Sequence, residues 1–393
     1  PHVHYEVLLN SVGVNTVTVS FNDIPPASRV SFPANAQVRS AVATLSGTAA
    51  PASPVSPVAQ VYVSIGQVQF GTTDYFRGAS FNGATEYFNL ASWSGSDPWT
   101  YSAGGVPFTS GLRYLLRSQA RDASGNLEDP SGVAPVPFLF DTQIPTGAVT
   151  SLSQGQYRNA ANPLSGAAFD GPNDAAGLDA AVNGGLQVRV LETDTGKWFS
   201  GTSFSQADAS LAWQNTTTGG NAQGTPWTYN NVNLDGQLIN GRSYLVQFRA
   251  KDRAVPANQG PSLDGLSAGF TLGVDSVTFI TDKAPPVSTI TLPGNGAIVN
   301  ALPTLSGTAT DALAGVGSVA VSIQENPSGS GPYWNGSTFS AATEQFFTAS
   351  FAGGAWALAT PPLQSNFSYR VRARSRDNAL PAGNFEGSPA AVT

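Results

Sequence analysis

Very few residues of this chain could carry out catalysis. The run Gly265–Gly269 (GLSAG) matches the G-x-S-x-G pattern, in which a serine on a sharp strand-to-helix turn acts as a nucleophile. Such a serine needs a histidine later in the chain as its general base. The only histidines are His2 and His4, so Ser267 has no such partner. Because the chain also lacks cysteine, we expect no enzymatic activity.

The two histidines are themselves a candidate metal site. They are two residues apart on a predicted strand, so both rings would lie on one side and could share a metal ion. Only Glu6 is near enough in sequence to add a carboxylate. A solvated segment that binds no metal is the alternative, and it is the interpretation that we prefer.

Carboxylates that follow three similar strands form a second candidate metal site. Asp122, Asp252 and Asp377 each close a strand and precede a turn. Asp122 and Asp377, together with Glu128 and Glu386, could bind calcium at domain junctions, because calcium prefers oxygen ligands. The second repeat has a glutamine near the place of these glutamates, which weakens the calcium prediction. In the alternative, each aspartate caps its turn by accepting backbone N–H bonds.

The strands that would position these aspartates share one pattern. They read YLLRSQARD at 114–122, YLVQFRAKD at 244–252 and YRVRARSRD at 369–377. Alternate residues of a strand point to opposite faces, so each copy has one apolar or small face and one polar or cationic face. This alternation predicts half-buried antiparallel strands that begin at Tyr114, Tyr244 and Tyr369. The intervals between these tyrosines are as long as a domain, so the chain is a tandem array of similar domains.

The third copy carries an unusual cationic face. It consists of Arg370, Arg372, Arg374 and Arg376. We expect these guanidinium groups to pair across the sheet or to be solvated. Contact with an acidic neighbouring domain is the alternative.

Composition limits the class of protein further. Of 393 residues only 11% are charged, whereas glycine (42) and proline (28) are abundant, which favours strands and turns. A net charge of −7 argues against nucleic acid as a partner. The absence of cysteine excludes disulfides, and no apolar run is long enough to span a membrane. Since the chain begins at Pro1 and contains no methionine, we expect a processed product or part of a longer chain.

Junction sequences divide the chain into four parts. GVNTVTVSFNDIPP (13–26) resembles GVDSVTFITDKAPP (273–286), and both read as a closing strand that leads into a proline-bearing linker. We therefore predict an orphan closing strand at 1–21 with Val14, Val17, Val19 and Phe21 as its polymerisation residues. The predicted domains follow it: repeat 1 at 22–140, repeat 2 at 141–281, and repeat 3 at 282–393, which lacks its own last strand.

Each repeat keeps the same landmarks in the same order. These are LSGTA or LSGAA, an aromatic-Gly-x-Ser/Thr-Phe block, a tryptophan at Trp99, Trp227 or Trp356, and the tyrosine strand. The series resembles the immunoglobulin-like repeats of large bacterial surface and adhesin-type proteins. The resemblance implies an all-β fold, with three tandem antiparallel β-sandwiches of about seven strands each. The tyrosine strand would be strand F, with a tyrosine corner but without the disulfide found in many such domains.

The functional expectation is a structural one. The array would be a subunit or segment of an extracellular or cell-surface bacterial fibre, filament or stalk, joined to its own kind by continuation or donation of the strand at 1–21. One alternative is an adhesin that binds glycans or a host protein through loops at the sandwich ends, and Phe76, Phe199 and Trp334 could then stack on sugars. The other alternative is a non-catalytic spacer module of a secreted enzyme. No cofactor is expected apart from calcium at the junctions.

Overall fold

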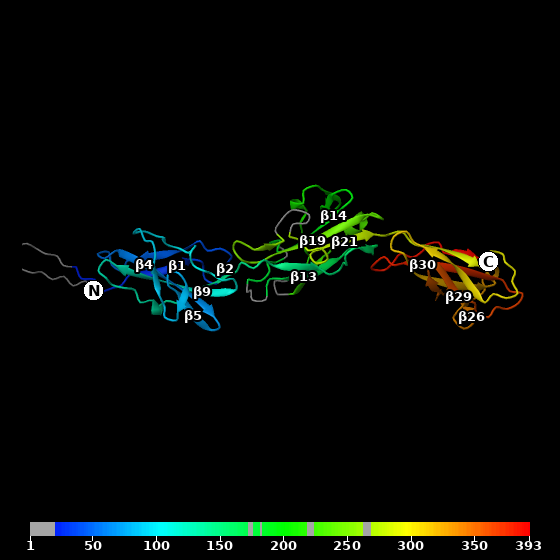
Figure 1. The fold of residues 1–393 in the computed structure, drawn as a ribbon, viewed down its shortest axis with the longest axis horizontal. Helices are drawn as coiled ribbons and strands as arrows, with labels where there is room; N and C mark the ends of the chain where they lie inside the picture. Colours follow the sequence, from blue (N-terminus) through cyan, green and yellow to red (C-terminus); the bar gives the residue numbers. More distant parts are fainter. Residues whose placement is uncertain (1–19, 172–175, 181–182, 218–223, 262–268) are drawn as a thin grey trace, which may run out of the picture.

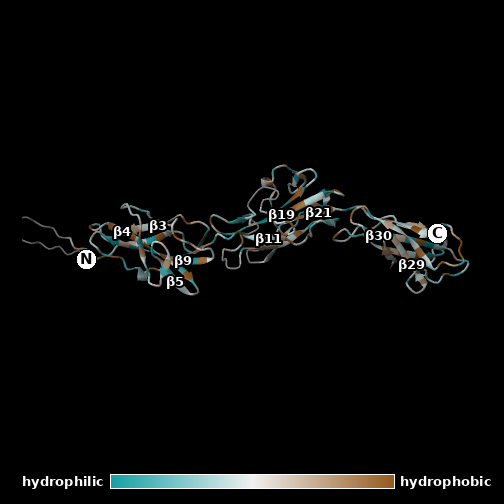
Figure 2. Ribbon diagram, in the orientation of Figure 1, coloured by the Kyte–Doolittle hydropathy of each residue, from teal (hydrophilic) through white to brown (hydrophobic). Residues whose placement is uncertain are grey.

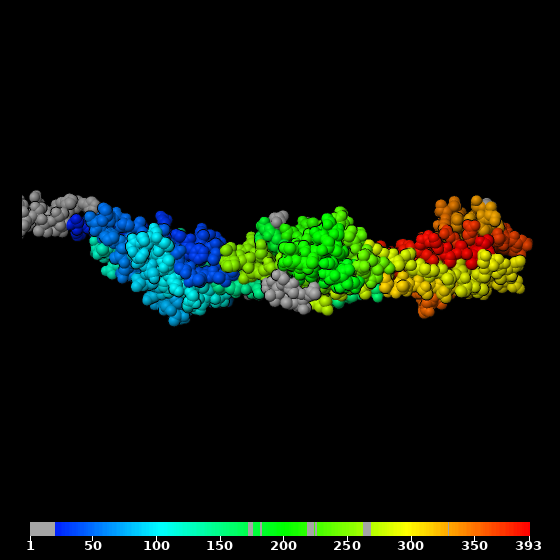
Figure 3. Space-filling model, turned by 90° about the horizontal axis from the view of Figure 1, so that it is seen from above, coloured from blue at the N-terminus to red at the C-terminus, as the bar shows by residue number. Residues whose placement is uncertain are grey.

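The computed structural model describes residues 20–171, 176–180, 183–217, 224–261 and 269–393. These residues form three β-sandwich domains that follow one another in line (Figure 1). Figure 3 shows the same elongated shape from above, with domain 1 and domain 3 at opposite ends. Domain 1 comprises residues 27–140, domain 2 residues 146–281 and domain 3 residues 287–393. Short proline-bearing linkers at 141–145 and 282–286 connect them.

Each domain has a small sheet and a larger one. The small sheet of domain 1 contains β1 (Ala27–Phe32), β3 (Thr44–Ala50) and β8 (Trp99–Ser102). The larger sheet contains, in spatial order, β2 (Gln37–Arg39), β10 (Val136–Phe140), β9 (Leu112–Asp122), β4 (Val58–Gln69), β5 (Thr72–Phe76) and β6 (Phe81–Gly83). β7 (Phe88–Leu90) pairs with β4, and a 3₁₀ turn, η1, spans Pro130–Gly132.

Domain 2 repeats this arrangement. Its small sheet contains β11 (Thr146–Val149), β13 (Leu164–Phe169) and β18 (Thr225–Tyr229). The larger sheet contains, in spatial order, β12 (Gln156–Arg158), β21 (Ser276–Thr281), β19 (Ser243–Lys251), β14 (Leu186–Glu192), β15 (Lys197–Phe199) and β16 (Phe204–Gln206). The remaining elements are β17 (Gln214–Asn215) on β14, β20 (Gln259–Gly260) on β19, η3 (Ser210–Ala212) and α1 (Leu234–Gln237).

Domain 3 has the same order with a reduced edge. Its small sheet contains β22 (Val287–Leu292), β23 (Thr304–Thr310), β29 (Ala355–Ala359) and β28 (Ser350–Ala352). The larger sheet contains β26 (Phe339–Ala341), β25 (Tyr333–Trp334), β24 (Val316–Glu325), β30 (Tyr369–Asp377) and β31 (Ala390–Val392). β27 (Phe347–Thr348) pairs with β24, and η4 spans Pro327–Gly329. The chain is thus all-β with three tandem immunoglobulin-like sandwiches, as the sequence predicted.

β31 corrects one expectation about domain 3. The sequence predicted that this repeat lacks its last strand, but β31 pairs with β30, with Val392 opposite Val371. Its pairs run from Ala390 to Val392, whereas in domain 1 the closing strand includes Phe138 opposite Tyr114 and runs to Phe140. β2 and β12 pair in parallel with the closing strands of the other two domains, and the described residues of domain 3 form no strand in that place.

A buried tryptophan over a glycine forms the centre of each core. Trp99, Trp227 and Trp356 are at most 1% exposed. A Cβ atom added at Gly307, in the LSGTA motif of domain 3, would lie 2.7 Å from the Trp356 ring and 1.9 Å from the Thr289 carbonyl oxygen. Gly47 and Gly166 have equally close neighbours. The glycine of the repeated motif is therefore required because the indole packs directly on the backbone.

The tyrosine strands form the corner that the resemblance implied. The Tyr114 hydroxyl accepts a hydrogen bond from the backbone N–H of Thr109 at 2.7 Å, five residues upstream. Tyr244 and Tyr369 make the equivalent bonds to Ile239 (2.9 Å) and Gln364 (2.8 Å). Hydrophobic and hydrophilic residues are mixed along the strands of each domain, as alternation between an inner and an outer face requires (Figure 2).

Buried glutamates join the sheets in domains 1 and 3. Glu386 accepts hydrogen bonds from the backbone and side chain of Ser288 (3.0 and 2.6 Å) and from those of Ser375 (3.1 and 2.9 Å). Glu128 likewise binds Ser28 and the backbone of Ala120 in domain 1. These bonds hold β22 on the inner face of β30, and β1 on that of β9.

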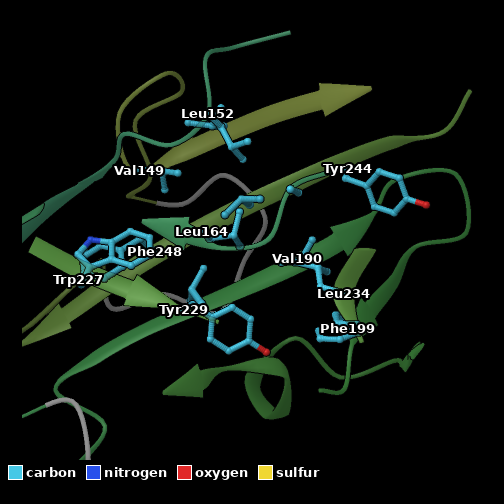
Figure 4. Close-up of a cluster of buried hydrophobic side chains, with 14 of the residues drawn as sticks. Val149, Leu152, Leu164, Val190, Phe199, Trp227, Tyr229, Leu234, Tyr244 and Phe248 are labelled. Carbon is cyan, nitrogen blue, oxygen red and sulfur yellow. The ribbon is translucent and has the colours of Figure 1, made fainter. Parts of the chain in front are cut away.

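Domain 2 fills the same position with an aromatic ring. Strand register places Gly260 where the other domains have glutamate, and Gly147 where they have Ser28 and Ser288. The ring of Phe248 occupies the space and stacks on Trp227, with ring centroids 4.4 Å apart (Figure 4). A Cβ atom on Gly147 would lie 2.2 Å from Phe248. A domain can therefore hold either the buried glutamate with its serine or the phenylalanine ring at this position, but not both.

Candidate functional site at the domain junctions

Each tyrosine strand ends in an aspartate that holds the following turn and the preceding linker. The Asp252 carboxylate accepts hydrogen bonds from the Asn258 backbone (2.8 Å) and side chain (2.6 Å). The Asn258 side chain also donates to the Asp141 carbonyl oxygen in the linker, at 3.0 Å. A strand end, a turn and a linker are thereby connected through two side chains.

The same arrangement occurs in the other two domains. In domain 3, Asn384 bonds to Asp377 at 2.6 Å and to the Asp282 carbonyl oxygen at 2.9 Å. In domain 1, Asn126 bonds to Asp122 and to the carbonyl oxygen of Asn22, both at 2.9 Å. The alternative in which each aspartate caps its turn therefore describes these bonds.

Successive domains are also joined by backbone pairing. At the joint between domains 1 and 2 (joint 1–2), the Val255 N–H donates to the Val38 carbonyl at 3.1 Å, and the Ser40 N–H donates to the Val255 carbonyl at 3.4 Å. At the joint between domains 2 and 3 (joint 2–3), the corresponding bonds run from Leu380 to Tyr157 (3.0 Å) and from Asn159 to Leu380 (2.8 Å). The segment around β2 or β12 of one domain thus extends onto the turn of the next.

Two clusters of carboxylates lie at these joints. Asp141, Asp170 and Asp252 offer oxygens within 4.8 Å of one another at joint 1–2. Asp282, Asp311 and Asp377 do the same at joint 2–3. Sequence reasoning found Asp252 and Asp377 but treated the linker aspartates only as boundary markers. The recurring interval from the LSG glycine to Asp170 and Asp311 was the signal that could have found the others.

Strand register shows what the start of domain 1 lacks. Residues 22 and 51 occupy the positions that residues 141 and 170 occupy in domain 2, and they are asparagine and proline. Asp122 has no second carboxylate there, and the Asn22 side chain donates a hydrogen bond to it at 2.7 Å. At this junction the amide of Asn22 thus takes the place of the carboxylate that Asp141 and Asp282 supply at the other two junctions.

The predicted calcium ligands are therefore only partly brought together. Asp377 lies in a cluster, whereas Asp122 does not. Glu128 and Glu386 are buried among serines of their own domains, so they contribute to the sandwich cores instead of to a junction. His2, His4, Val14, Val17, Val19 and Ser267 lie outside the described residues. Phe21 is 60% exposed.

Crowding of negative charge at joint 1–2 changes the protonation of Asp170. Burial, together with the charges of Asp141 and Asp252, raises the pKa of Asp170 to about 7, and Arg253 offsets only part of this effect. Burial also raises the pKa of Asp252. The joint therefore contains more negative charge than its surroundings stabilise.

Without divalent cations, we expect the stability of domain 2 to fall as the pH rises from about 4 to 7. Folded Asp170 keeps its proton up to about pH 7, while the unfolded side chain releases it near 3.8. The folded state then binds more protons within this window, so the free energy of unfolding decreases with pH. Calorimetry in EDTA checks this expectation against Asp170→Asn. The Tm of wild type relative to that of the variant should fall as the pH rises from about 4 to 7. A difference in Tm that stays constant over this range would contradict the expectation.

An open groove lies at the far end of domain 3. It has a volume of about 570 Å³ and is lined by Ile298, Leu302, Phe367, Tyr369 and Thr393, among others. In the other two domains the closing strand fills this position. Phe138 stacks on Tyr114, and Phe279 stacks on Tyr244, each with ring centroids 5.4 Å apart. In domain 3 the strand pairs reach Val392 opposite Val371, and Ile298 is fully exposed.

The remaining candidates are explained by packing. Arg372 forms an ion pair with Glu344 at 2.7 Å, and the Arg374 guanidinium lies over the Phe346 ring, so the cationic face is paired within its own domain. Phe76 and Phe199 are 1% exposed, which excludes them as sugar-stacking surfaces. Their role is to fill the core.

The strand arrangement defines the class of protein, which is a tandem array of immunoglobulin-like sandwiches whose successive domains are joined by backbone hydrogen bonds. The sequence matches no family model and no curated protein. No helix in the described part of the chain is long and apolar enough to cross a membrane.

Several solved structures of tandem domains are similar to this chain. The chicken CNTN1 FN1-FN3 domains are 12% identical, with 94% of this chain and 99% of that one covered and a TM-score of 0.30. The Clostridium thermocellum CbhA fibronectin(III)-like modules are 15% identical over 65% and 94%, with a TM-score of 0.27. A tetra-tandem repeat from the extending region of a large adhesion protein is 17% identical over 90% and 70%, with a TM-score of 0.25. These values carry no argument about function.

Proposed function

We propose that this chain is a structural segment of an extracellular bacterial fibre, filament or stalk, and that it acts without catalysis. The observation that carries the proposal is the repetition of one joint. At both joints the linker carbonyl accepts a hydrogen bond from the turn asparagine, and the backbone pairs across the domains. Flexibly tethered domains do not need such pairing, whereas a stiff extended array does.

The start of domain 1 supports continuation of the array in the N-terminal direction. The Asn22 carbonyl oxygen accepts the hydrogen bond from a turn asparagine that the Asp141 and Asp282 carbonyl oxygens accept at the two joints. Asp141 and Asp282 each directly follow the closing strand of a domain. In this register Val19 takes the position of Phe138 and Phe279. Residues 1–21 would therefore be the closing strand of a domain that precedes domain 1.

The groove of domain 3 supports the matching arrangement at the other end. A strand that carries an apolar side chain next to Tyr369 would fill it, as Phe138 and Phe279 fill their own domains. The strand at 1–21 reaches such a groove in one of two ways. It continues from a preceding domain of the same polypeptide, or a second copy of the chain donates it.

Assembly of the purified chain tests the donation route. We expect residues 1–393 to form linear assemblies and residues 22–393 to remain single, with domains 1 and 2 still folded. Val19→Asp should also abolish assembly, because a charge would enter the apolar groove. Thr18→Asp is the matched control, since its side chain points to the opposite face of the strand. Light scattering and electron microscopy provide the measurement, and fibres formed by residues 22–393 would exclude donation.

The mass of the denatured native material tests continuation. A mass near 40.5 kDa would indicate discrete subunits of this sequence. A much larger mass would indicate one covalent chain in which 1–21 closes a preceding domain. Native material in which this chain is found neither in fibres nor in surface structures would contradict the proposed function itself.

A further inference from the structure

The carboxylates at joint 1–2 come from three separate elements. Asp141 follows β10 in the linker, Asp170 follows β13, and Asp252 follows β19. All three are at most 1% exposed, and their oxygens lie within 4.8 Å of one another. A buried carboxylate is costly unless hydrogen bonds or a positive charge stabilise it.

One oxygen of this cluster is buried without any partner. Asp141 Oδ1 accepts a hydrogen bond from the Gln143 N–H at 2.8 Å, but Oδ2 has none. Arg253, whose charge acts on Asp170, donates its Nε–H to the Ala176 carbonyl at 2.8 Å. Among the described residues, no ion pair joins Asp141 or Asp252 to an arginine or lysine. Asp141 Oδ2 is therefore a buried carboxylate oxygen that receives neither a hydrogen bond nor an ion pair from the described residues.

The other two junctions satisfy their oxygens with the protein alone. At joint 2–3, Asp282 accepts hydrogen bonds on both oxygens, from the backbones of Ala284 (3.1 Å) and Ala314 (2.9 Å), and Asp311 is only half-buried. At the start of domain 1, Asn22 supplies an amide in place of a second carboxylate. The need for a cation is therefore specific to joint 1–2.

We propose that joint 1–2 binds one divalent cation of the size and hardness of calcium, with Asp141, Asp170 and Asp252 as its protein ligands. A cluster made only of carboxylate oxygens favours a hard cation over zinc or copper. Two oxygens bound to one calcium ion lie at most about 5 Å apart, since calcium–oxygen distances are about 2.3–2.6 Å. The spacing of the cluster fits this limit, and water can complete the coordination. This inference does not depend on the proposed assembly into fibres.

Calcium titration of the full 1–393 chain, after removal of metals with EDTA, tests the proposal. We expect wild type to bind one calcium ion that Asp141→Asn loses, or binds at least about tenfold more weakly. The chain itself carries asparagine at the equivalent position 22, so this variant should fold. Asp282→Asn is the matched control at joint 2–3 and should keep the site at joint 1–2. The Tm of domain 2 should rise with CaCl₂ in wild type and in Asp282→Asn but not in Asp141→Asn.

Three results would overturn the proposal. One is the absence of calcium binding to wild type. Another is equal binding by wild type and Asp141→Asn. The third is a Tm of domain 2 that does not change with CaCl₂ at pH 7.5 but does change with pH. This result would mean that the carboxylates share protons and need no cation. None of these results bears on whether the chain forms fibres, so the two proposals fail independently.

Discussion

Replacement of Gly307 by valine should unfold domain 3 while domains 1 and 2 remain folded. The new Cβ atom would lie 1.9 Å from the Thr289 carbonyl oxygen and 2.7 Å from the Trp356 ring. Neither neighbour can move easily, because the carbonyl belongs to the paired strand β22 and the indole is buried in the core. Overpacking of this kind costs about 3 kcal/mol or more, a large share of the stability of one domain.

The expected result is specific to one domain because each sandwich has its own core. Calorimetry should show the transition of domain 3 disappear while the other transitions remain. Gly387→Val is the control, since a Cβ atom at Gly387 meets nothing within 4 Å and lies in the same domain. An unchanged domain 3 in Gly307→Val would mean that the tryptophan does not pack on this glycine.

The second large effect is expected for Glu386→Ala. The change leaves the backbone N–H groups of Ser288 and Ser375 and the Ser375 hydroxyl without an acceptor, whereas the Ser288 hydroxyl can still donate to the Ala373 carbonyl at 3.0 Å. Each unsatisfied buried group costs about 1–3 kcal/mol, so we expect domain 3 to lose about 4 kcal/mol even if water enters part of the space. Calorimetry that follows the unfolding transition of domain 3 in the full chain provides the measurement.

Glu344→Ala is the control for the loss of a carboxylate. Glu344 pairs with Arg372, where both side chains are partly exposed, and accepts one hydrogen bond from the buried Ser322 hydroxyl at 2.6 Å, so its removal should cost about 1–2 kcal/mol, clearly less than the loss of Glu386. Comparable losses in the two variants would contradict the role of Glu386 in joining the sheets.

The sequence predicted the architecture because the same local rules recur in every domain. Alternation along 114–122 requires a strand with one buried face, and the motif glycine at Gly47 and the later Trp99 recur in order, so the repeat is visible without a structure. The structure adds the reason for this pairing, which is contact between the indole and the backbone.

The site was harder to predict because its residues meet only in three dimensions. Glu128 and Glu386 follow the strand aspartates at similar intervals, so they seemed to belong with them. The direction of the chain after the turn decides otherwise, and both side chains point into the sandwich. Asp141 and Asp170 are far apart in sequence from Asp252, and only the packing of three strand ends brings them together.

The double attachment at each joint has a consequence for the course of a long array. Two neighbouring domains are held by the covalent linker and, beside it, by backbone pairing at Val255 or Leu380. Two attachments side by side resist torsion about the long axis, whereas a single linker permits it. Each joint then imposes its own fixed rotation on the next domain, and a series of like joints adds these rotations with the same sign. If the chain forms the long array proposed above, we expect that array to wind into a superhelix, with a pitch set by the linker and the turn that it contacts.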